Sequence, residues 1–152
     1  MKKTIAVVLL TFAVACGNSM TGPSGLISMT GTWAGTASDS SGSLGANSMM
    51  GQVGMGTMTW PLTQSGSTVT GSMNFSGMQG RMPGSFSGMM TGDEMTFTMA
   101  MAAGSMMAAG CSSTASGTAH MNRTTMTMTG TYGGSNSCTG AFTNGQMTMT
   151  RR

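Results

Sequence analysis

The sequence predicts an all-β protein, an antiparallel up-and-down barrel of about eight strands, with a two-sheet β-sandwich as the alternative. Three observations support this prediction. Short runs of apolar residues, mostly Met, alternate with Thr or Ser, which is the period of a β-strand. Gly-rich sequences typical of turns separate these runs. After residue 15, no run has the 3.6-residue period of a helix.

The first four strands follow from this alternation and from one hairpin signal. We expect them over residues 29–37, 57–63, 69–75 and 82–90. The segment 64–67 contains Gly and is typical of a hairpin turn. Pro61 predicts an edge, a bulge or a strand end, because proline cannot donate to a ladder. The Ser/Gly-rich segment 38–51 has no period and is expected to be a loop.

The last four strands are expected over residues 95–101, 111–121, 125–132 and 146–151. The first of them has the clearest alternation in the chain, with Met and Phe on one face and Thr on the other. A turn precedes it at 91–94, and 102–109 is either a loop or one helical turn. The face of the sheet that packs inward is therefore expected to consist largely of Met.

The N-terminus has two lysines, a short apolar run and small residues before Cys16, which is the arrangement of a bacterial export signal. Ala-Val-Ala-Cys at 13–16 resembles the lipobox of bacterial lipoproteins, whose cysteine is lipidated and becomes the first mature residue. The resemblance implies a signal peptide over 1–15, a lipidated flexible tether over 16–26 and a single domain over 27–152. Gly17 is not the aspartate of an inner-membrane retention signal, so the implied location is the outer membrane. In the alternative, an ordinary secretory signal, Cys16 has no role.

The charged residues argue against nucleic-acid binding by their number and against an enzyme by their arrangement. The chain without residues 1–15 keeps four arginines against three acidic residues, so no basic patch exists to bind nucleic acid. Asp93 and Glu94 are adjacent and should point apart, unlike the facing carboxylates of glycosidases. His120 is the single histidine of the chain, and no nucleophile motif accompanies it. We expect no enzyme.

The chain has three cysteines, one at the predicted cleavage site and two in the predicted domain. If Cys16 carries the lipid, Cys111 and Cys138 remain as a pair. An exported protein meets an oxidising compartment, so we expect a disulfide between them, with two free thiols as the alternative.

Short motifs near both ends of the predicted domain resemble the lipocalin and avidin superfamily. Gly31-Thr32-Trp33 and Arg151 resemble the Gly-x-Trp of its first strand and the basic residue of its last strand, which pack on each other. Residues 62–71 and 129–132 also resemble hairpins of small lipocalin-like bacterial lipoproteins. The resemblance implies the barrel architecture and a structural contact among Gly31, Trp33 and Arg151. It implies no ligand-binding residue, and the few polar aromatic residues do not support a biotin-type pocket.

Methionine is the one abnormal residue type, with 22 of 152 positions. Met can fill a core in place of Val, Ile and Leu, because its side chain is flexible and polarizable. Thioethers also bind soft ions such as Cu(I) or Ag(I). The candidate metal ligands are Met99, Met101, His120, Met121, Met126 and Met128. Sacrificial oxidation is a third explanation, and it requires exposed residues such as Met49, Met50, Met106 and Met107.

These observations predict a monomeric lipoprotein of the bacterial cell envelope that is attached to the membrane by its lipid. Its barrel is expected to bind a small apolar ligand or a protein partner, in or on the barrel. The alternative is a Met-rich protein that binds Cu(I) or Ag(I). No other cofactor is expected.

Overall fold

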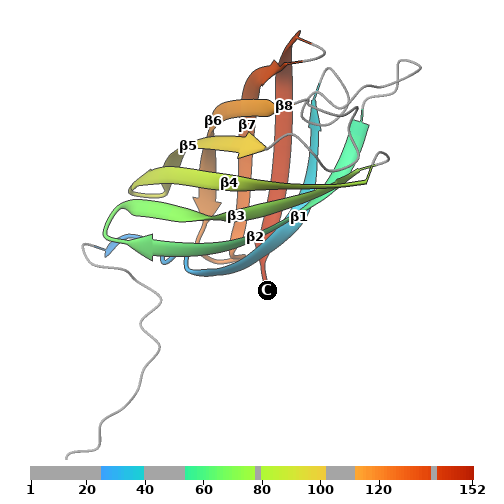
Figure 1. The fold of residues 1–152 in the computed structure, drawn as a ribbon. Helices are drawn as coiled ribbons and strands as arrows, with labels where there is room; N and C mark the ends of the chain where they lie inside the picture. The colour runs from blue at the N-terminus through green and yellow to red at the C-terminus, as the bar shows by residue number, and fades with distance from the viewer. Residues whose placement is uncertain (1–24, 40–53, 78–79, 102–111, 138–139) are drawn as a thin grey trace, which may run out of the picture.

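The computed structural model describes residues 25–39, 54–77, 80–101, 112–137 and 140–152. Eight antiparallel strands, each paired with its neighbours in sequence, close into one barrel through the β1–β8 pair (Figure 1). The strands are β1 (Gly31–Asp39), β2 (Gly54–Ser65), β3 (Thr68–Gly77), β4 (Gly80–Thr91), β5 (Glu94–Met101), β6 (Ser113–Asn122), β7 (Thr127–Asn136) and β8 (Gly140–Arg151). The prediction of an all-β, eight-stranded barrel is confirmed, and its closure excludes the sandwich.

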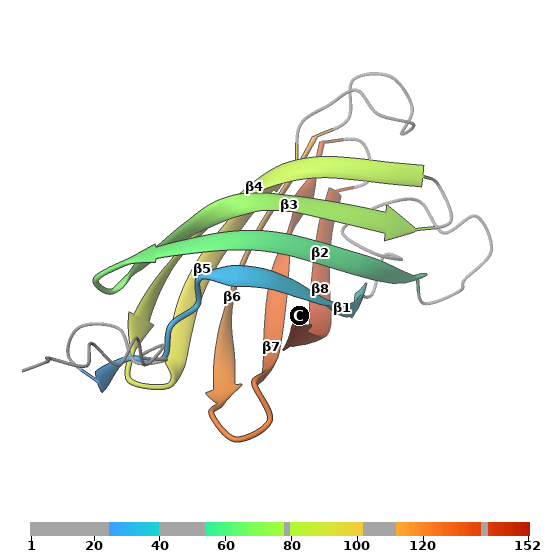
Figure 2. The same cartoon turned by 90° about the horizontal axis from the view of Figure 1, so that it is seen from below.

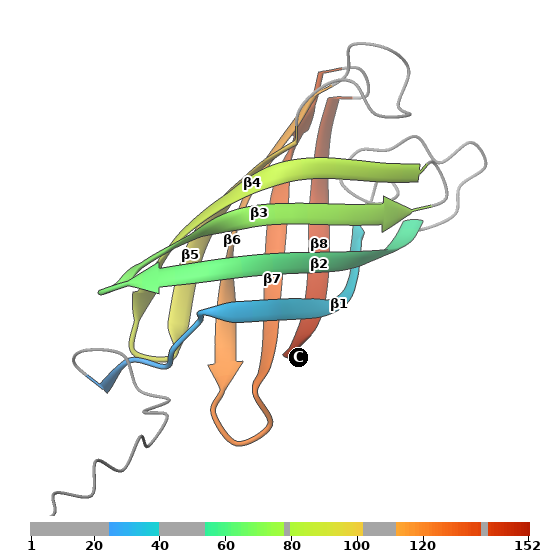
Figure 3. The same ribbon diagram turned by 60° about the horizontal axis from the view of Figure 1, so that its bottom comes forward.

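The strands of opposite walls cross at a steep angle. Seen from below, β2 to β4 run across β6 to β8 (Figure 2), and the same crossing is visible in Figure 3. Strands in a small barrel tilt against its axis, so opposite walls cross by about twice the tilt. Side chains from opposite walls therefore interdigitate across a narrow interior.

Pro61 lies inside β2 and does not end it. Its exposed side chain faces outward, and it is paired with Thr32 of β1. On the other edge of β2, the ladder to β3 runs from Thr57 to Thr59 and resumes at Leu62. Proline has no N–H to donate, so its effect is a local gap in one ladder.

The last strand begins at Gly140, six residues before the predicted start. A register shift interrupts the β7–β8 ladder between Tyr132 and Gly134. Asn144 has φ 56° there, the left-handed conformation that asparagine tolerates better than most residues. The bulge breaks the alternation on which the sequence prediction depended.

Three described turns mark one end of the barrel, here called the turn end. They connect β2 to β3 at 66–67, β4 to β5 at 92–93, and β6 to β7 at 123–126. Gly66 has φ 60° and Gly92 has φ 63°, which tight hairpin turns require and glycine allows without strain. The opposite end, where β1 ends and β2 begins, is here called the far end.

The segment 25–30 precedes β1 and lies against the turn end. Its backbone is held from two sides: Met29 N donates to Gln64 Oε1 at 2.6 Å, and Arg123 Nη1 donates to Gly25 O at 3.1 Å. Figure 3 shows this blue segment beside the turn between β4 and β5. Because Met29 is fully buried, the segment forms part of the core as well as its cover.

Methionine is the commonest residue of the described core, as the core-filling explanation predicts. The buried methionines of the described residues are Met29, Met58, Met73, Met90, Met95, Met99, Met101, Met121, Met128, Met147 and Met149. Branched aliphatic residues contribute only Ile27, Leu62 and Val69 to this part of the core. Thr and Ser dominate the outward positions, so each strand is apolar inside and hydroxyl-bearing outside.

Glycine and large residues alternate around the barrel. Phe97 of β5 lies between Gly88 and Gly117 on the neighbouring strands. Tyr132 of β7 lies between Gly117 and Gly145. A narrow barrel cannot accept a large side chain at every position of one layer, so this alternation makes the interior fillable.

Candidate functional site

An aromatic cluster occupies the interior between β2, β4 and β5. The ring centroid of Trp60 lies 4.7 Å from that of Phe86 and 6.3 Å from that of Phe97. The two phenylalanine rings are stacked at 5.6 Å. These distances are typical of favourable aromatic pairs, so the cluster forms a rigid apolar wall.

Glycine allows the three rings to meet although β2 and β4 are not neighbours. Gly71 on the intervening strand β3 is directly opposite both Leu62 and Phe86. A Cβ on Gly71 would lie 2.2 Å from the backbone oxygen of Pro61. Without a side chain at this position, the ring of Phe86 can reach across β3 toward Trp60.

The indole N–H of Trp60 has no hydrogen-bond partner among the described residues. Its Nε1 atom is fully buried, and it is the unsatisfied buried side-chain nitrogen found among the described residues. The neighbouring Trp33, directly opposite on β1, donates its own Nε1–H to Met29 O at 2.8 Å. Buried indole N–H groups normally find an acceptor, so Trp60 is the exception that needs an explanation.

Buried polar side chains gather at the far end of the barrel. Asp39, Ser113 and Asn136 are each only 2–3% exposed. Asn136 Nδ2 donates to Ser113 Oγ at 2.6 Å across the β6–β7 pair. Tyr132 reaches the same end and donates its hydroxyl to Ser38 O at 3.1 Å.

Tyr132 stays neutral at any ordinary pH. Burial raises the pKa of its phenol far above the usual value, and the charge and hydrogen bond of Asp39 raise it further. The hydroxyl therefore remains a hydrogen-bond donor at the polar far end.

The predicted metal ligands fall into separate places. Met99 and Met101 lie in β5; their cross-strand partners are Phe86 and Ala115 for the first, and Gly84 and Ser113 for the second. Met121 and Met128 are opposite each other on β6 and β7, nearer the turn end. Met126 is in the adjoining turn and is half-buried against the core.

His120 does not join these methionines. Its side chain is 59% exposed on the outer wall, and its Nδ1 lies 2.7 Å from Glu94 Oε1. Asp93, the neighbour of Glu94, instead accepts hydrogen bonds from Arg123. The two acidic residues thus take different partners, as expected from their adjacency.

Gly31, Trp33 and Arg151 come together at the turn end. Trp33 and Arg151 are directly opposite on β1 and β8. A Cβ on Gly31 would lie 2.9 Å from Arg151 Nε, so the guanidinium packs against this glycine. Arg151 Nη1 also donates to Ser28 O at 3.4 Å, which ties the last strand to the segment before β1. These contacts are structural.

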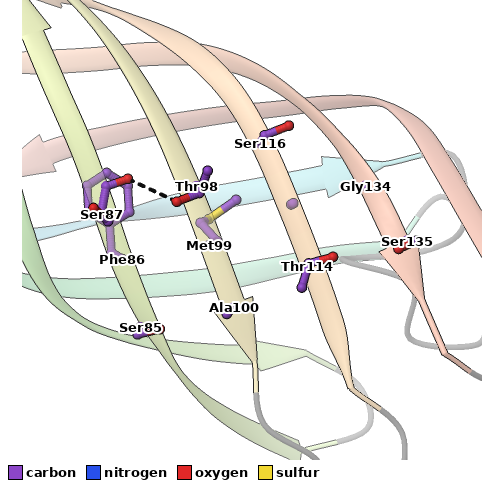
Figure 4. A pocket seen from close by; sticks show the side chains of 11 residues that line it. Ser85, Phe86, Ser87, Thr98, Met99, Ala100, Thr114, Ser116, Gly134 and Ser135 are labelled. Carbon is purple, nitrogen blue, oxygen red and sulfur yellow. Dashed lines mark hydrogen bonds between the residues drawn. The ribbon is translucent and has the colours of Figure 1, made fainter.

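A depression of about 670 Å³ lies on the outer wall across β4 to β7 (Figure 4). Its exposed lining consists of hydroxyl side chains and Ala100; the hydroxyl residues are Ser85, Ser87, Thr98, Thr114, Ser116 and Ser135. Thr98 Oγ1 donates to Ser87 O at 3.5 Å. None of its lining residues is charged, so it offers hydroxyl, methyl and backbone groups and no group that would select a particular ligand.

Several predictions lie outside the described residues. Cys16, Cys111 and Cys138, the signal peptide over 1–15 and most of the tether over 16–26 belong to this group, as do Met49, Met50, Met106 and Met107. Within the described ranges, no three His, Cys, Asp or Glu side chains are placed to hold a metal ion together. In the same ranges, no helix is long and apolar enough to cross a membrane.

Sequence reasoning missed the unpaired Trp60 N–H and the buried polar set at the far end. An unpaired N–H depends on neighbours from other strands, and no local pattern reveals it. Asp39 and Asn136 each occupy an inward position at a strand end, so the alternation of buried positions in β1 and β7 was the signal that could have found them.

No family model matches the chain, and no curated protein or solved structure shows a significant match. The closed, eight-stranded antiparallel barrel is compatible with a lipocalin-like fold. A barrel of this kind hosts many functions, so the function must be argued from the side chains of this chain.

Proposed function

We propose that this protein is a lipid-anchored barrel of the bacterial cell envelope that binds one small apolar ligand carrying a hydrogen-bond acceptor. Trp60 would donate its indole N–H to that acceptor, and Phe86 and Phe97 would contact the apolar part of the ligand. The observation behind the proposal is the fully buried Trp60 Nε1, which has no partner within the described part of the chain. Leaving such a donor unsatisfied costs about 1–3 kcal/mol, which a bound acceptor would recover.

The methionine core supports binding because it can rearrange. Eleven of the buried core residues are methionines, which could move to make room for a ligand inside the barrel. Met58 precedes Trp60 by two residues on the same face of β2, and the β2–β3 register places Met73 beside Trp60. Met has three rotatable side-chain bonds and repacks at low cost, which binding surfaces that accept several ligands exploit.

The anchor would set the orientation of the barrel. The tether leads into the segment 25–30, which lies on the turn end. A lipid on Cys16 would therefore hold the turn end toward the membrane and leave the far end facing away. Ligand entry would then occur at the far end, beside the polar side chains of Asp39 and Tyr132.

A matched ligand pair tests the role of Trp60. Acetophenone and ethylbenzene share a phenyl ring and a two-carbon side chain, but only acetophenone carries a carbonyl acceptor. We expect acetophenone to shift the indole N–H resonance of Trp60 in ¹H–¹⁵N spectra of the mature protein and to bind about 3–10 times more tightly than ethylbenzene. The resonance of Trp33, already bonded to Met29 O, is the internal control.

Trp60→Phe keeps an aromatic ring and removes the donor, so this variant should lose the preference for acetophenone and bind ethylbenzene at least as tightly, because the carbonyl would be buried without a partner. Equal binding of the two compounds to the unmodified protein, or no shift of the Trp60 resonance, would contradict the proposal. The anchor is tested separately: Cys16→Ser should release the protein from membranes, and retention at the membrane would contradict a lipid on this residue.

A further inference from the structure

Three buried methionines face one another on adjacent strands near the turn end. Met128 of β7 is directly opposite Met121 of β6 on one side and Met149 of β8 on the other. All three are at most 1% exposed, so their thioethers point into the barrel. Residues directly opposite in an antiparallel pair have Cβ atoms about 4.5–5.5 Å apart, and the flexible Met side chain can bring neighbouring sulfurs closer.

Met126 adds a fourth thioether from an unusual backbone position. Its φ is 50°, a left-handed conformation that is uncommon for residues other than Gly, Asn and Asp. The turn is fixed by Asn122 Oδ1, which accepts from the backbone N–H of Thr124 and Thr125 at 3.0 and 3.1 Å. Met126 O accepts from Arg151 N at 3.1 Å, and the side chain packs against the core. The strained turn thus keeps this methionine at the end of the Met121–Met128–Met149 row.

The donor set selects the kind of ion. The side chains that face one another here are neutral, soft thioethers, and the nearest charged group on the same face of β8 is the guanidinium of Arg151, which packs against Gly31. His120 is bonded to Glu94, and Asp93 is bonded to Arg123. A site with no anionic ligand cannot compensate a divalent charge, but thioethers suit soft monovalent ions. We propose that Met121, Met128, Met149 and Met126 form a binding site for one Cu(I) or Ag(I) ion.

Met99 and Met101 on β5 are buried methionines that do not belong to such a row. Met99 has Phe86 and Ala115 as its cross-strand partners, and Met101 has Gly84 and Ser113. Neither has a thioether directly opposite. Replacing these two methionines therefore gives a control variant with the same chemistry of substitution at the same depth of burial.

Silver binding tests the site without any reductant that could disturb a disulfide. The chain carrying Cys16→Ser, with its methionine methyl groups labelled with ¹³C, is titrated with Ag(I). We expect one equivalent to shift the methyl resonances of Met121, Met128 and Met149, and that of Met126 with them. The variant M121L/M128L/M149L should bind Ag(I) at least tenfold more weakly, whereas M99L/M101L should bind like the parent. Cu(I) competition with a colourless chelator should rank the three proteins in the same order.

Leucine conserves volume, so the triple variant should remain folded if the methionines only fill space. If it does not fold, the methyl shifts of the parent protein decide the question alone. No shift after one equivalent of Ag(I), shifts centred on Met99 and Met101, or unchanged Ag(I) affinity in a folded triple variant would each overturn the proposal. None of these results bears on ligand binding at Trp60, which is measured by its own indole resonance.

Discussion

The ring of Tyr132 lies directly over Gly145 across the β7–β8 pair, so closely that a Cβ on Gly145 would be 2.5 Å from ring carbon Cδ2. The absence of a side chain on β8 is what allows the tyrosine to lie flat and reach Ser38 O at the far end. The contact also lies beside the β-bulge, where the register changes. One glycine thus supports both the packing of the interior and the position of the phenol.

Gly145→Ala should destabilise the barrel by about 1–3 kcal/mol, because the added methyl group overpacks the interior against Tyr132. Urea unfolding measures the loss. In a Tyr132→Ala background the same substitution should cost much less, since the ring that it meets is gone. An equal cost in both backgrounds would show that Tyr132 is not the cause.

Gln64→Ala should loosen the segment before β1. The side-chain oxygen of Gln64 accepts from Met29 N at 2.6 Å, and losing this bond should cost about 0.5–1.5 kcal/mol. Hydrogen exchange of the Met29 amide should accelerate. Gln146→Ala, at an exposed position on β8, is the matched control and should leave this amide protected. Unchanged exchange in Gln64→Ala would contradict the role of Gln64 in holding the segment.

The Asp93–Arg123 pair should make a small, pH-dependent contribution to stability. The hydrogen bond from Arg123 lowers the pKa of Asp93 below its usual value of 3.8. A carboxyl group whose pKa is lowered by folding stabilises the fold above its unfolded pKa and loses this effect as pH falls through the folded pKa. Asp93→Asn should therefore lower Tm slightly at pH 6 and have no effect near pH 2. In an Arg123→Gln background the difference at pH 6 should vanish.

The sequence predicts those features of the barrel that depend on local alternation, and it misses those that depend on a bulge or on contacts between strands. Alternation of Met and Thr located β5 almost to the residue, because successive side chains of a strand must face opposite sides. The same rule places His120 on the outer face of β6 and Met121 on its inner face, so these two predicted metal ligands cannot point to the same place. The early start of β8 was hidden, since Asn144 and Gly145 at the bulge disturb the period.

The surroundings of Trp60 and the row of methionines could be recognised only once the strand pairing of the closed barrel was known. The partners of Trp60 come from β4 and β5, and whether its N–H finds an acceptor is decided by neighbours that no local pattern specifies. The row of methionines likewise depends on register: Met149 was not among the predicted ligands, although pairing of β7 with β8 brings it opposite Met128. The two-residue period of a strand predicts which face of the sheet a residue occupies. Only the pairing of the strands shows which side chains it contacts.

Methionine oxidation should follow burial. Met89 is 56% exposed on β4, whereas Met95 on the adjoining strand is fully buried. Peroxide should oxidise Met89 at least about ten times faster than Met95, because the buried thioether reacts only after local opening. Peptide mass spectrometry measures both rates. In denaturant the two residues should react at similar rates, and similar rates in the folded protein would contradict this account of the core.

The predicted disulfide joins residues that adjoin, in the sequence, the described end of the β6–β7 pair. The ladder pairs Ser113 with Asn136, and one residue further Ser137 N donates to Ser112 O at 2.9 Å while Ser112 N donates to Ser137 Oγ at 3.0 Å. Cys111 precedes Ser112 and Cys138 follows Ser137 in the sequence, and both cysteines lie outside the described residues.

Cys111→Ser/Cys138→Ser should therefore lower the free energy of unfolding by about 3 kcal/mol, the value expected for closing a loop of this length. Reduction of the parent protein should produce the same loss, while the double variant should be insensitive to reductant. Peptide mapping without reductant should recover the two cysteines as one cross-linked pair. Two free thiols in the exported protein would contradict the prediction.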